Sequence, residues 1–170
     1  MPAVKCQGSS VRCRVKPKGF TLIELLIVIS IIAILVAAAT ASWRNAQLKG
    51  RDGKRKVDLK ATQQALEIYL QANGKYPSAS SGQIQCNITG DTTIKSWGAS
   101  FTCGSTTYMQ QLPKDPAYQT ATDGYYYSSA SPNLTYILSA KLENTNDPDI
   151  AASALLCTPQ SPRNFCVVNP

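Results

Sequence analysis

The feature that most constrains this chain is an apolar stretch near its start. Residues 20–39 read FTLIELLIVISIIAILVAAA and carry a single charge, on Glu24. As an α-helix, a stretch of this length spans about 30 Å, the thickness of the hydrocarbon core of a bilayer. A carboxylate near the start of such a helix is unfavourable in lipid and usually has a function. We therefore predict a membrane-spanning helix at residues 20–42 and a role for Glu24.

A basic segment precedes the apolar stretch and contains no acidic residue. Its five cations account for most of the net charge of +7, because 17 basic residues less these five leave 12, against 10 acidic ones. They are Lys5, Arg12, Arg14, Lys16 and Lys18. The basicity is therefore typical of a targeting segment, and the sequence gives little support for a nucleic-acid partner. A secretory signal peptide cut near residues 37–41 is the alternative, although its apolar part would be unusually long.

The chain contains no histidine, and its acidic residues are few. The absence of histidine excludes Ser-His-Asp and Cys-His catalysis and every zinc site that uses histidine. No glycine-rich nucleophile turn replaces them. We therefore predict a protein that is not an enzyme.

The junction between the basic segment and the apolar stretch reads KGFTLIELL from Lys18 to Leu26. This motif resembles the class III signal of type IV pilins and type II secretion pseudopilins. The resemblance implies that residues 1–19 are a leader peptide, removed by a prepilin peptidase that cuts after Gly19. It also implies that the new N-terminal residue, Phe20, is N-methylated, and that Glu24, the fifth residue of the mature chain, is required for assembly. In a bundle of apolar helices the Phe20 amine and the Glu24 carboxylate of neighbouring subunits can satisfy each other.

The same resemblance implies a place in the cell and a set of partners. The chain is expected to be a single-pass protein of the inner (cytoplasmic) membrane with its head outside the cytoplasm. Its expected partners are further copies of itself in a filament, the prepilin peptidase, the inner-membrane assembly machinery and membrane lipid. The filament, a type IV pilus or a type II secretion pseudopilus, would lie in the periplasm or on the cell surface. The alternative is a membrane-anchored or secreted, disulfide-stabilised binding module.

A helical pattern continues after the apolar stretch, and we predict an amphipathic helix over residues 43–73. Its apolar stripe contains Leu59, Thr62, Leu66 and Tyr69, joined by Ala61, Ala65, Ile68 and Ala72. Asn73 and Gly74, followed by Pro77, predict where the helix ends.

Two further features of this helix lead to expectations about its middle. Gly50 and Gly53 each disfavour a helix interior by about 1 kcal/mol, so a bend or a melted stretch is expected around Arg51. The basic run at residues 51–56 is expected to be solvated or to face lipid head groups, in preference to nucleic acid.

Residues 74–170 are predicted to form a small β-rich head. Residues 125–129 and 134–142 alternate in polarity around a turn at 131–133 and predict a hairpin, and residues 93–97 and 100–103 are further strand candidates. One face of the second hairpin strand, with Leu134, Tyr136, Leu138 and Ala140, suits packing on the amphipathic helix. The predicted fold class is α+β: a long N-terminal helix, part transmembrane and part amphipathic, packed on a small antiparallel sheet.

Four cysteines in the predicted head favour disulfide staples. Cys86, Cys103, Cys157 and Cys166 lie in polar sequence without a C-x-x-C motif, which favours two disulfides over a four-thiolate zinc site. Three pairings exist, and closure between nearest neighbours gives Cys86 with Cys103 and Cys157 with Cys166.

Segments of the head, at residues 112–116, 124–128 and 136–143, are similar to the head of the major pseudopilin of type II secretion. That resemblance implies a calcium ion in a C-terminal loop, where Asn146, Asp147 and Asp149 offer oxygen ligands. The same residue types are also those of an ordinary exposed turn, and both interpretations stay open. No other cofactor is predicted.

Overall fold

The computed structural model describes residues 19–117 and 124–170, apart from the side chains of residues 38–42. Most of the leader, with Cys6 and Cys13, lies outside this range. The chain divides into two compact units, Met1–Trp43 and Arg44–Pro170. One helix, α1 (Leu22–Asn73), contributes residues to both units, so each unit is described below by itself.

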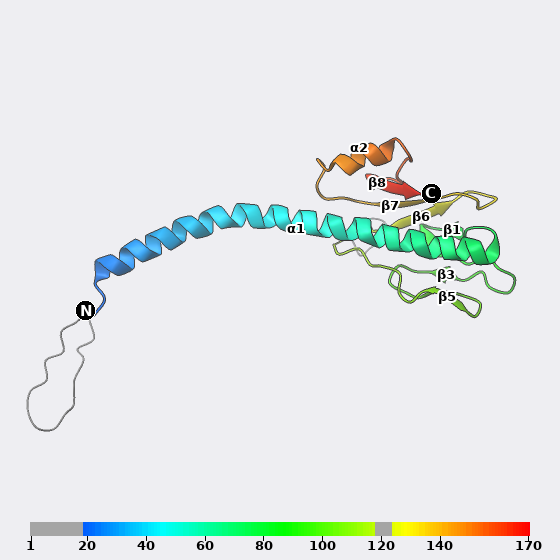
Figure 1. Ribbon diagram of the computed structural model, residues 1–170, viewed down its shortest axis with the longest axis horizontal. Coiled ribbons are helices and arrows are strands. Elements are labelled where there is room, and N and C mark those ends of the chain that lie inside the picture. Colours follow the sequence, from blue (N-terminus) through cyan, green and yellow to red (C-terminus); the bar gives the residue numbers. More distant parts are fainter. Residues whose placement is uncertain (1–18, 118–123) are drawn as a thin grey trace, which may run out of the picture. The chain divides into compact units, whose positions relative to one another are not determined.

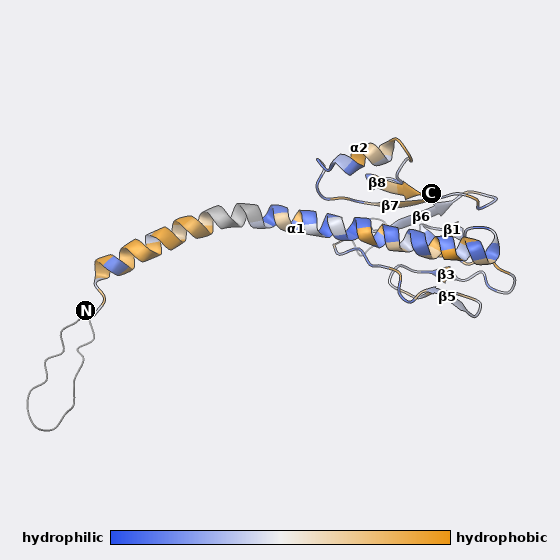
Figure 2. Ribbon diagram, viewed as in Figure 1, coloured by the Kyte–Doolittle hydropathy of each residue, from blue (hydrophilic) through white to orange (hydrophobic). Residues whose placement is uncertain are grey.

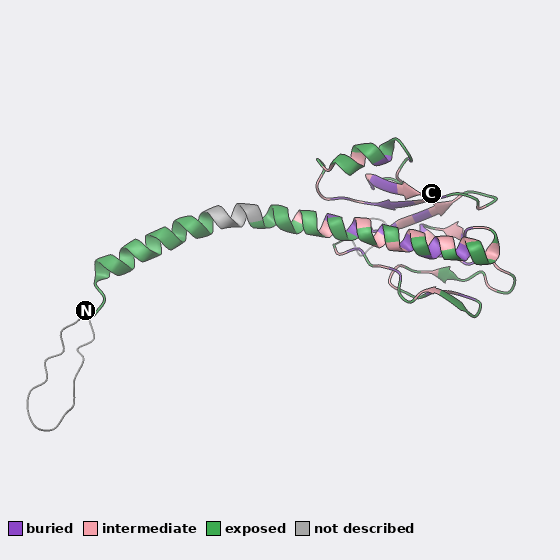
Figure 3. Ribbon diagram, viewed as in Figure 1, coloured by how far each residue is buried: buried purple, intermediate pink, exposed green. Residues whose placement is uncertain are grey.

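In the first unit, α1 is apolar and exposed. Figure 2 shows its hydrophobic character, and Figure 3 shows that residues 20–37 are all exposed. Phe20 and Leu22 are 84% and 88% exposed. Among the described residues, no helix is both long enough and apolar enough to cross a membrane.

In the second unit, the predicted apolar stripe of α1 faces the core. Leu59, Leu66 and Tyr69 are fully buried, whereas Ile68 is 52% exposed and lies at the edge of the stripe. The helix ends at Asn73 as predicted, because Gly74 takes a φ of +71° and its N–H bonds to the carbonyl of Leu70 at 2.7 Å. The periodicity of the sequence therefore identified the buried face of this helix, and the Asn73-Gly74 pair identified its end.

The expectation of a melted stretch near Arg51 is wrong. The structure has unbroken α-helix across Gly50 and Gly53. A Cβ atom built at either glycine would meet nothing within 4 Å, so no packing within the described residues requires glycine there. At this point charged side chains of the helix form ion pairs with distant carboxylates of the head, as described below. The sequence did not predict these ion pairs.

The head contains three small antiparallel sheets, and Figure 1 labels their strands where there is room. The first has the order β1-β2-β3 (Ser78–Ser80, Gln83–Gln85, Ile94–Lys95), the second pairs β4 with β5 (Phe101–Cys103, Thr106–Met109), and the third has the order β6-β7-β8 (Tyr126–Ser129, Tyr136–Ala140, Phe165–Val168). A second helix, α2 (Pro148–Ala154), precedes β8. The β6-β7 hairpin confirms the predicted one, with Tyr127 opposite Leu138. Strands β1, β2, β5 and β8 and helix α2 were not predicted, because elements of three to seven residues carry little periodicity.

The core joins α1 to the third sheet and is rich in tyrosine. Tyr136, Leu138 and Ala140 of β7 are buried in the same cluster as Leu59 and Leu66 of α1. Leu134 is instead 58% exposed, because β7 begins only at Tyr136.

The tyrosine hydroxyls of this core have polar partners. The hydroxyl of Tyr127 donates to the carbonyl of Pro77 at 2.7 Å, and the hydroxyl of Tyr76 donates to Glu67 at 2.9 Å. These bonds let a small core gain aromatic area without leaving buried hydroxyls unsatisfied.

Two disulfides complete the α+β head. Cys86 is joined to Cys103 and Cys157 to Cys166, with Cα–Cα distances of 5.7 and 6.2 Å. These are the two pairs given by nearest-neighbour closure. The second disulfide ties the segment after α2 to β8.

Candidate functional site

The first candidate site is the start of α1, where the sequence predicts processing. Gly19 and Phe20 are both exposed. A Cβ atom built at Gly19 would meet nothing within 4 Å. Within the described residues nothing requires glycine at this position, so such a requirement has to come from a partner such as a protease.

Glu24 forms a reciprocal cap with Thr21 at the start of the helix. The Glu24 Oε2 atom accepts hydrogen bonds from the Thr21 backbone N–H at 3.0 Å and from its hydroxyl at 2.8 Å. The Glu24 N–H donates to Thr21 Oγ1 at 3.2 Å. This is a capping box, and a glutamine can perform the same role. Helix capping therefore does not explain the negative charge of Glu24.

The second candidate site is an ionic cluster in the head. It joins Arg51, Asp52, Arg55 and Lys56 of α1 to Asp115, Glu143, Asp147 and Asp149. The expectation that the basic run is solvated or faces lipid is wrong for its members Arg51, Arg55 and Lys56. Apart from Asp52, which pairs with Arg55 from three residues away, their partners lie 60 to 93 residues away in sequence, as in Arg55 with Asp115 and Lys56 with Asp149.

Arg55 is the buried centre of this cluster. Its side chain is 0% exposed, with Nε 2.7 Å from Asp115 Oδ2 and Nη1 2.7 Å from Asp52 Oδ1. Nη1 also lies 2.8 Å from Glu143 Oε1. Burial lowers the pKa of Arg55, but the hydrogen bonds to Asp115 and Glu143 outweigh burial and hold that pKa above its usual value. Removing this buried guanidinium from its three carboxylates would strongly destabilise the fold, because it would leave buried charges without their partner.

Glu143 and Asp52 connect the cluster to the chain that follows β7. Arg51 Nε lies 2.8 Å from Glu143 Oε1, and this hydrogen bond is the main cause that lowers the pKa of Glu143 to about 2. The Asp52 carboxylate accepts hydrogen bonds from the backbone N–H groups of Glu143 at 2.9 Å and Asn144 at 2.8 Å. Asp52 thus fixes the backbone of the loop that the sequence proposed for calcium.

The calcium candidates lie around the ammonium group of a lysine. Lys56 Nζ is 2.8 Å from both carboxylate oxygens of Asp147 and 2.6 Å from Asp149 Oδ2. Asp147 also caps α2 by accepting from the Asp149 N–H at 3.0 Å. Asn146 bonds through its backbone N–H to the side chain of Asn144. Because Lys56 holds the two carboxylates, the residues present do not fit a calcium ion.

Sequence reasoning identified Asp147 and Asp149 but missed Asp52, Asp115 and Glu143. A signal existed, since a chain with only 10 acidic residues places four of them in segments 112–116 and 143–149. Nothing in that pattern says which acid meets which cation, because the pairs join segments far apart in the chain.

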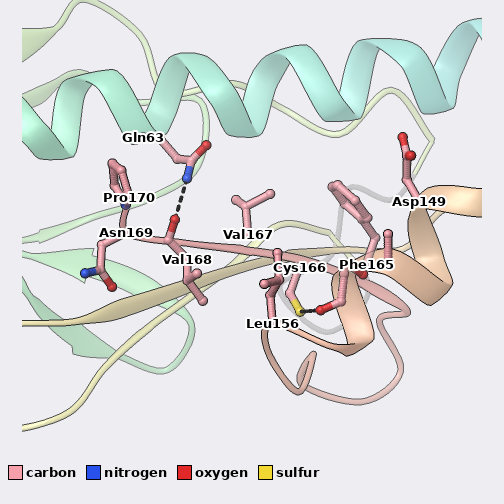
Figure 4. Close-up of a pocket in the computed structure, with 11 residues that line it drawn as sticks. Gln63, Asp149, Leu156, Phe165, Cys166, Val167, Val168, Asn169 and Pro170 are labelled. Carbon is pink, nitrogen blue, oxygen red and sulfur yellow. Dashed lines mark hydrogen bonds between the residues drawn. The ribbon is translucent and has the colours of Figure 1, made fainter.

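A groove beside α2 is lined mainly by apolar side chains (Figure 4). It has a volume of about 510 Å³ and includes Leu156, Phe165 and Val167. Gln63 of α1 closes one side by donating from Nε2 to the carbonyl of Val168 at 2.7 Å. Its lining suits contact with apolar groups.

Comparison with known proteins places the start of the chain in a defined class. Residues 14–40 match the family described as the prokaryotic N-terminal methylation motif. The chain is 31% identical to the type II secretion system core protein G of Pseudomonas aeruginosa over 105 residues, which cover 61% of this chain and 70% of that protein. It is 30% identical to the protein of the same name from Vibrio cholerae over 101 residues, covering 59% of this chain and 66% of that protein.

A relative with a pilin name is also similar to this chain, over a shorter stretch. The chain is 37% identical to the type IV major pilin protein PilA of Myxococcus xanthus over 59 residues, covering 35% of this chain and 27% of that protein. No solved structure matches the chain. The motif at Gly19 to Glu24, the helix that follows it and the similarity to core protein G together show that the chain belongs to the pilin and pseudopilin family of structural filament subunits.

Proposed function

We propose that the chain is a filament subunit of the pseudopilus type, matured by a cut after Gly19 and assembled through residues 20–42. The observation that carries this proposal is the exposed apolar start of α1. Residues 20–37 are all exposed, and their only charge is on Glu24. So large a continuous apolar surface requires burial in lipid or against other copies of the same helix. Both environments belong to the assembly of such a filament.

Charge pairing between subunits follows from the chemistry of the helix start. A cut after Gly19 creates a positive amine at Phe20, one residue before the cap. A cation is unfavourable at a helix N-terminus, because that end of the helix dipole is itself positive. In the described residues Oε1 of Glu24 accepts no hydrogen bond, while Oε2 serves the cap. We infer that Oε1 of one subunit receives the Phe20 amine of its neighbour, which sets the axial register.

We further propose that the precursor lies in the inner membrane with its head outside the cytoplasm. The two disulfides support this location, since such bonds persist in oxidising compartments. The prepilin peptidase and the inner-membrane assembly machinery are the partners that this route requires.

A pseudopilus is favoured over a pilus by the extent of the similarity. The relatives that match through the head are named core protein G of type II secretion, with 70% of the Pseudomonas aeruginosa protein covered. The match to the Myxococcus xanthus pilin covers only 27% of that protein. Deleting the gene should reduce the secretion of exported proteins and leave surface pili intact. Loss of surface pili with normal secretion would contradict the pseudopilus assignment.

The processing step is tested by the mass and N-terminal sequence of the protein in isolated membranes. We expect a chain that begins with methylated Phe20. A start near Thr40 would indicate an ordinary signal peptidase and a secreted binding module instead. Gly19→Leu should leave an uncut precursor, whereas Lys18→Gln, next to the same bond, should be processed; normal cutting of the Gly19 variant would contradict the site.

A further inference from the structure

The end of the loop between β7 and α2 and the first turn of α2 contribute two carboxylates whose positive partner is part of the chain itself. Lys56 Nζ lies 2.8 Å from both oxygens of Asp147 and 2.6 Å from Asp149 Oδ2. The Lys56 side chain is 27% exposed, and that of Asp147 is 15% exposed. The ammonium therefore lies between the two carboxylates. A metal ion that bound both carboxylates would need the same position.

The surroundings of Lys56 disfavour a second cation. Its Nζ atom also lies 5.9 Å from the ring centre of Phe165 on β8. Calcium takes six to eight oxygen ligands at about 2.3–2.6 Å. Asp147 and Asp149 would have to turn away from Lys56 to supply such a shell. An ammonium and a divalent cation beside the same carboxylates would also repel each other strongly.

The loop depends on this pairing for its position. Asp147 is the N-cap of α2, so the residue that Lys56 holds is the one at which that helix begins. Lys56 is thus a bridge from α1 to the start of α2. A divalent cation bound at Asp147 and Asp149 would compete with Lys56 for the same carboxylates.

We propose that Lys56 takes the place of a bound calcium ion in this head, so that the loop at residues 144–149 and helix α2 are held without metal. The proposal concerns the stability of the head and does not depend on the filament role. It predicts that calcium neither stabilises the native protein nor is needed to fold it.

The test is thermal unfolding of the full mature chain in detergent, followed by circular dichroism in CaCl₂ and in EDTA. For the native protein we expect the same Tm in both solutions. Lys56→Met keeps the apolar stem and removes the charge, so its Tm in EDTA should fall by several degrees. Calcium should then recover part of that loss, because two unpaired carboxylates are free to bind it.

Matched controls separate the lysine from general effects. Lys60→Met removes an exposed lysine one turn further along α1 and should leave Tm unchanged in both solutions. A native Tm that rises by several degrees in calcium would overturn the proposal. So would an unchanged Tm of Lys56→Met in EDTA, or a Lys56→Met protein that calcium does not restabilise. Magnesium in place of calcium should recover less, since it gives up its water ligands reluctantly.

Discussion

The two parts of α1 use the same secondary structure in opposite ways. Residues 22–37 are exposed and almost uniformly apolar. Residues 44–73 bury a stripe through Leu59, Leu66 and Tyr69 and place Arg55 in a buried ionic cluster. The second part finds its partners within its own chain, whereas the side chains of residues 22–37 stay exposed within the part of the chain that the structure describes. So large an exposed apolar surface suits contacts with lipid or with other copies of the chain, as proposed above.

Glu24→Gln should have the largest effect, because it acts on the part of α1 that relies on other molecules. Glutamine preserves the capping box with Thr21, so the helix start should be unchanged. It removes the charge that pairs with a neighbour's Phe20 amine. We expect normal cleavage and membrane level but few or no filaments in electron micrographs.

Thr21→Val is the matched control for that experiment. It removes the hydroxyl that bonds to Glu24 at 2.8 Å and retains the carboxylate. Filaments should form, with α1 less stable at its start by about 1 kcal/mol. Normal filaments from Glu24→Gln, together with their loss in Thr21→Val, would show that the cap is required and the charge is not.

Arg55→Met tests the part of α1 that is satisfied within the chain. The change leaves Asp52 and Asp115 buried without their cation, and breaking a buried pair in this way costs about 3–5 kcal/mol. Urea unfolding of the mature protein in detergent measures the loss. The exposed neighbour Lys54 provides the comparison, since Lys54→Met should change the free energy of unfolding by less than about 0.5 kcal/mol. Equal effects of the two changes would mean that the cluster does not stabilise the head.

Acid should weaken the same cluster. The pKa of Glu143 is about 2 in the folded head, against 4.5 as its ordinary value, mainly because Arg51 donates to it. A carboxyl whose pKa is lowered by folding stabilises the protein above its unfolded pKa, and that contribution disappears as pH falls toward the folded pKa. We expect the head to lose on the order of 1–3 kcal/mol between pH 5 and 2 through this group. Glu143→Gln, measured by urea unfolding at pH 7 and pH 3, should show a smaller difference between the two pH values than the native protein; an equal difference would assign the acid sensitivity to other groups.

Gly50→Ala and Gly53→Ala should have the smallest effect on stability, and they test whether the middle of α1 bends in use. A Cβ atom at either position meets nothing within 4 Å, and alanine favours a helix over glycine by about 0.5–1 kcal/mol. Each variant should therefore raise the free energy of unfolding by about that amount. Reduced filament formation by these more stable variants would show that assembly needs helix flexibility or close helix contact at the glycines. Unchanged assembly would show that the glycines have no such role.

The sequence by itself determined the local features of this protein. The motif from Gly19 to Glu24 was identified by its resemblance to a family signal. The buried stripe of α1 follows from a period of 3.6 residues, and the stop at Gly74 follows from the residue types at the helix end. The β6-β7 hairpin follows from alternation around a short turn, and the disulfide pairs follow from closure of the shortest loops.

Only the tertiary structure decided which charges meet. Arg55 pairs with Asp115 and Lys56 with Asp147 across 60 and 91 residues. Such pairs depend on how the chain returns to α1, and local propensity contains no information on that path. The basic run was for this reason expected in solvent or against lipid head groups, and the acids at Asp147 and Asp149 were expected to be either a calcium site or a plain turn. Their actual partner, Lys56, lies on the helix that the fold brings against them.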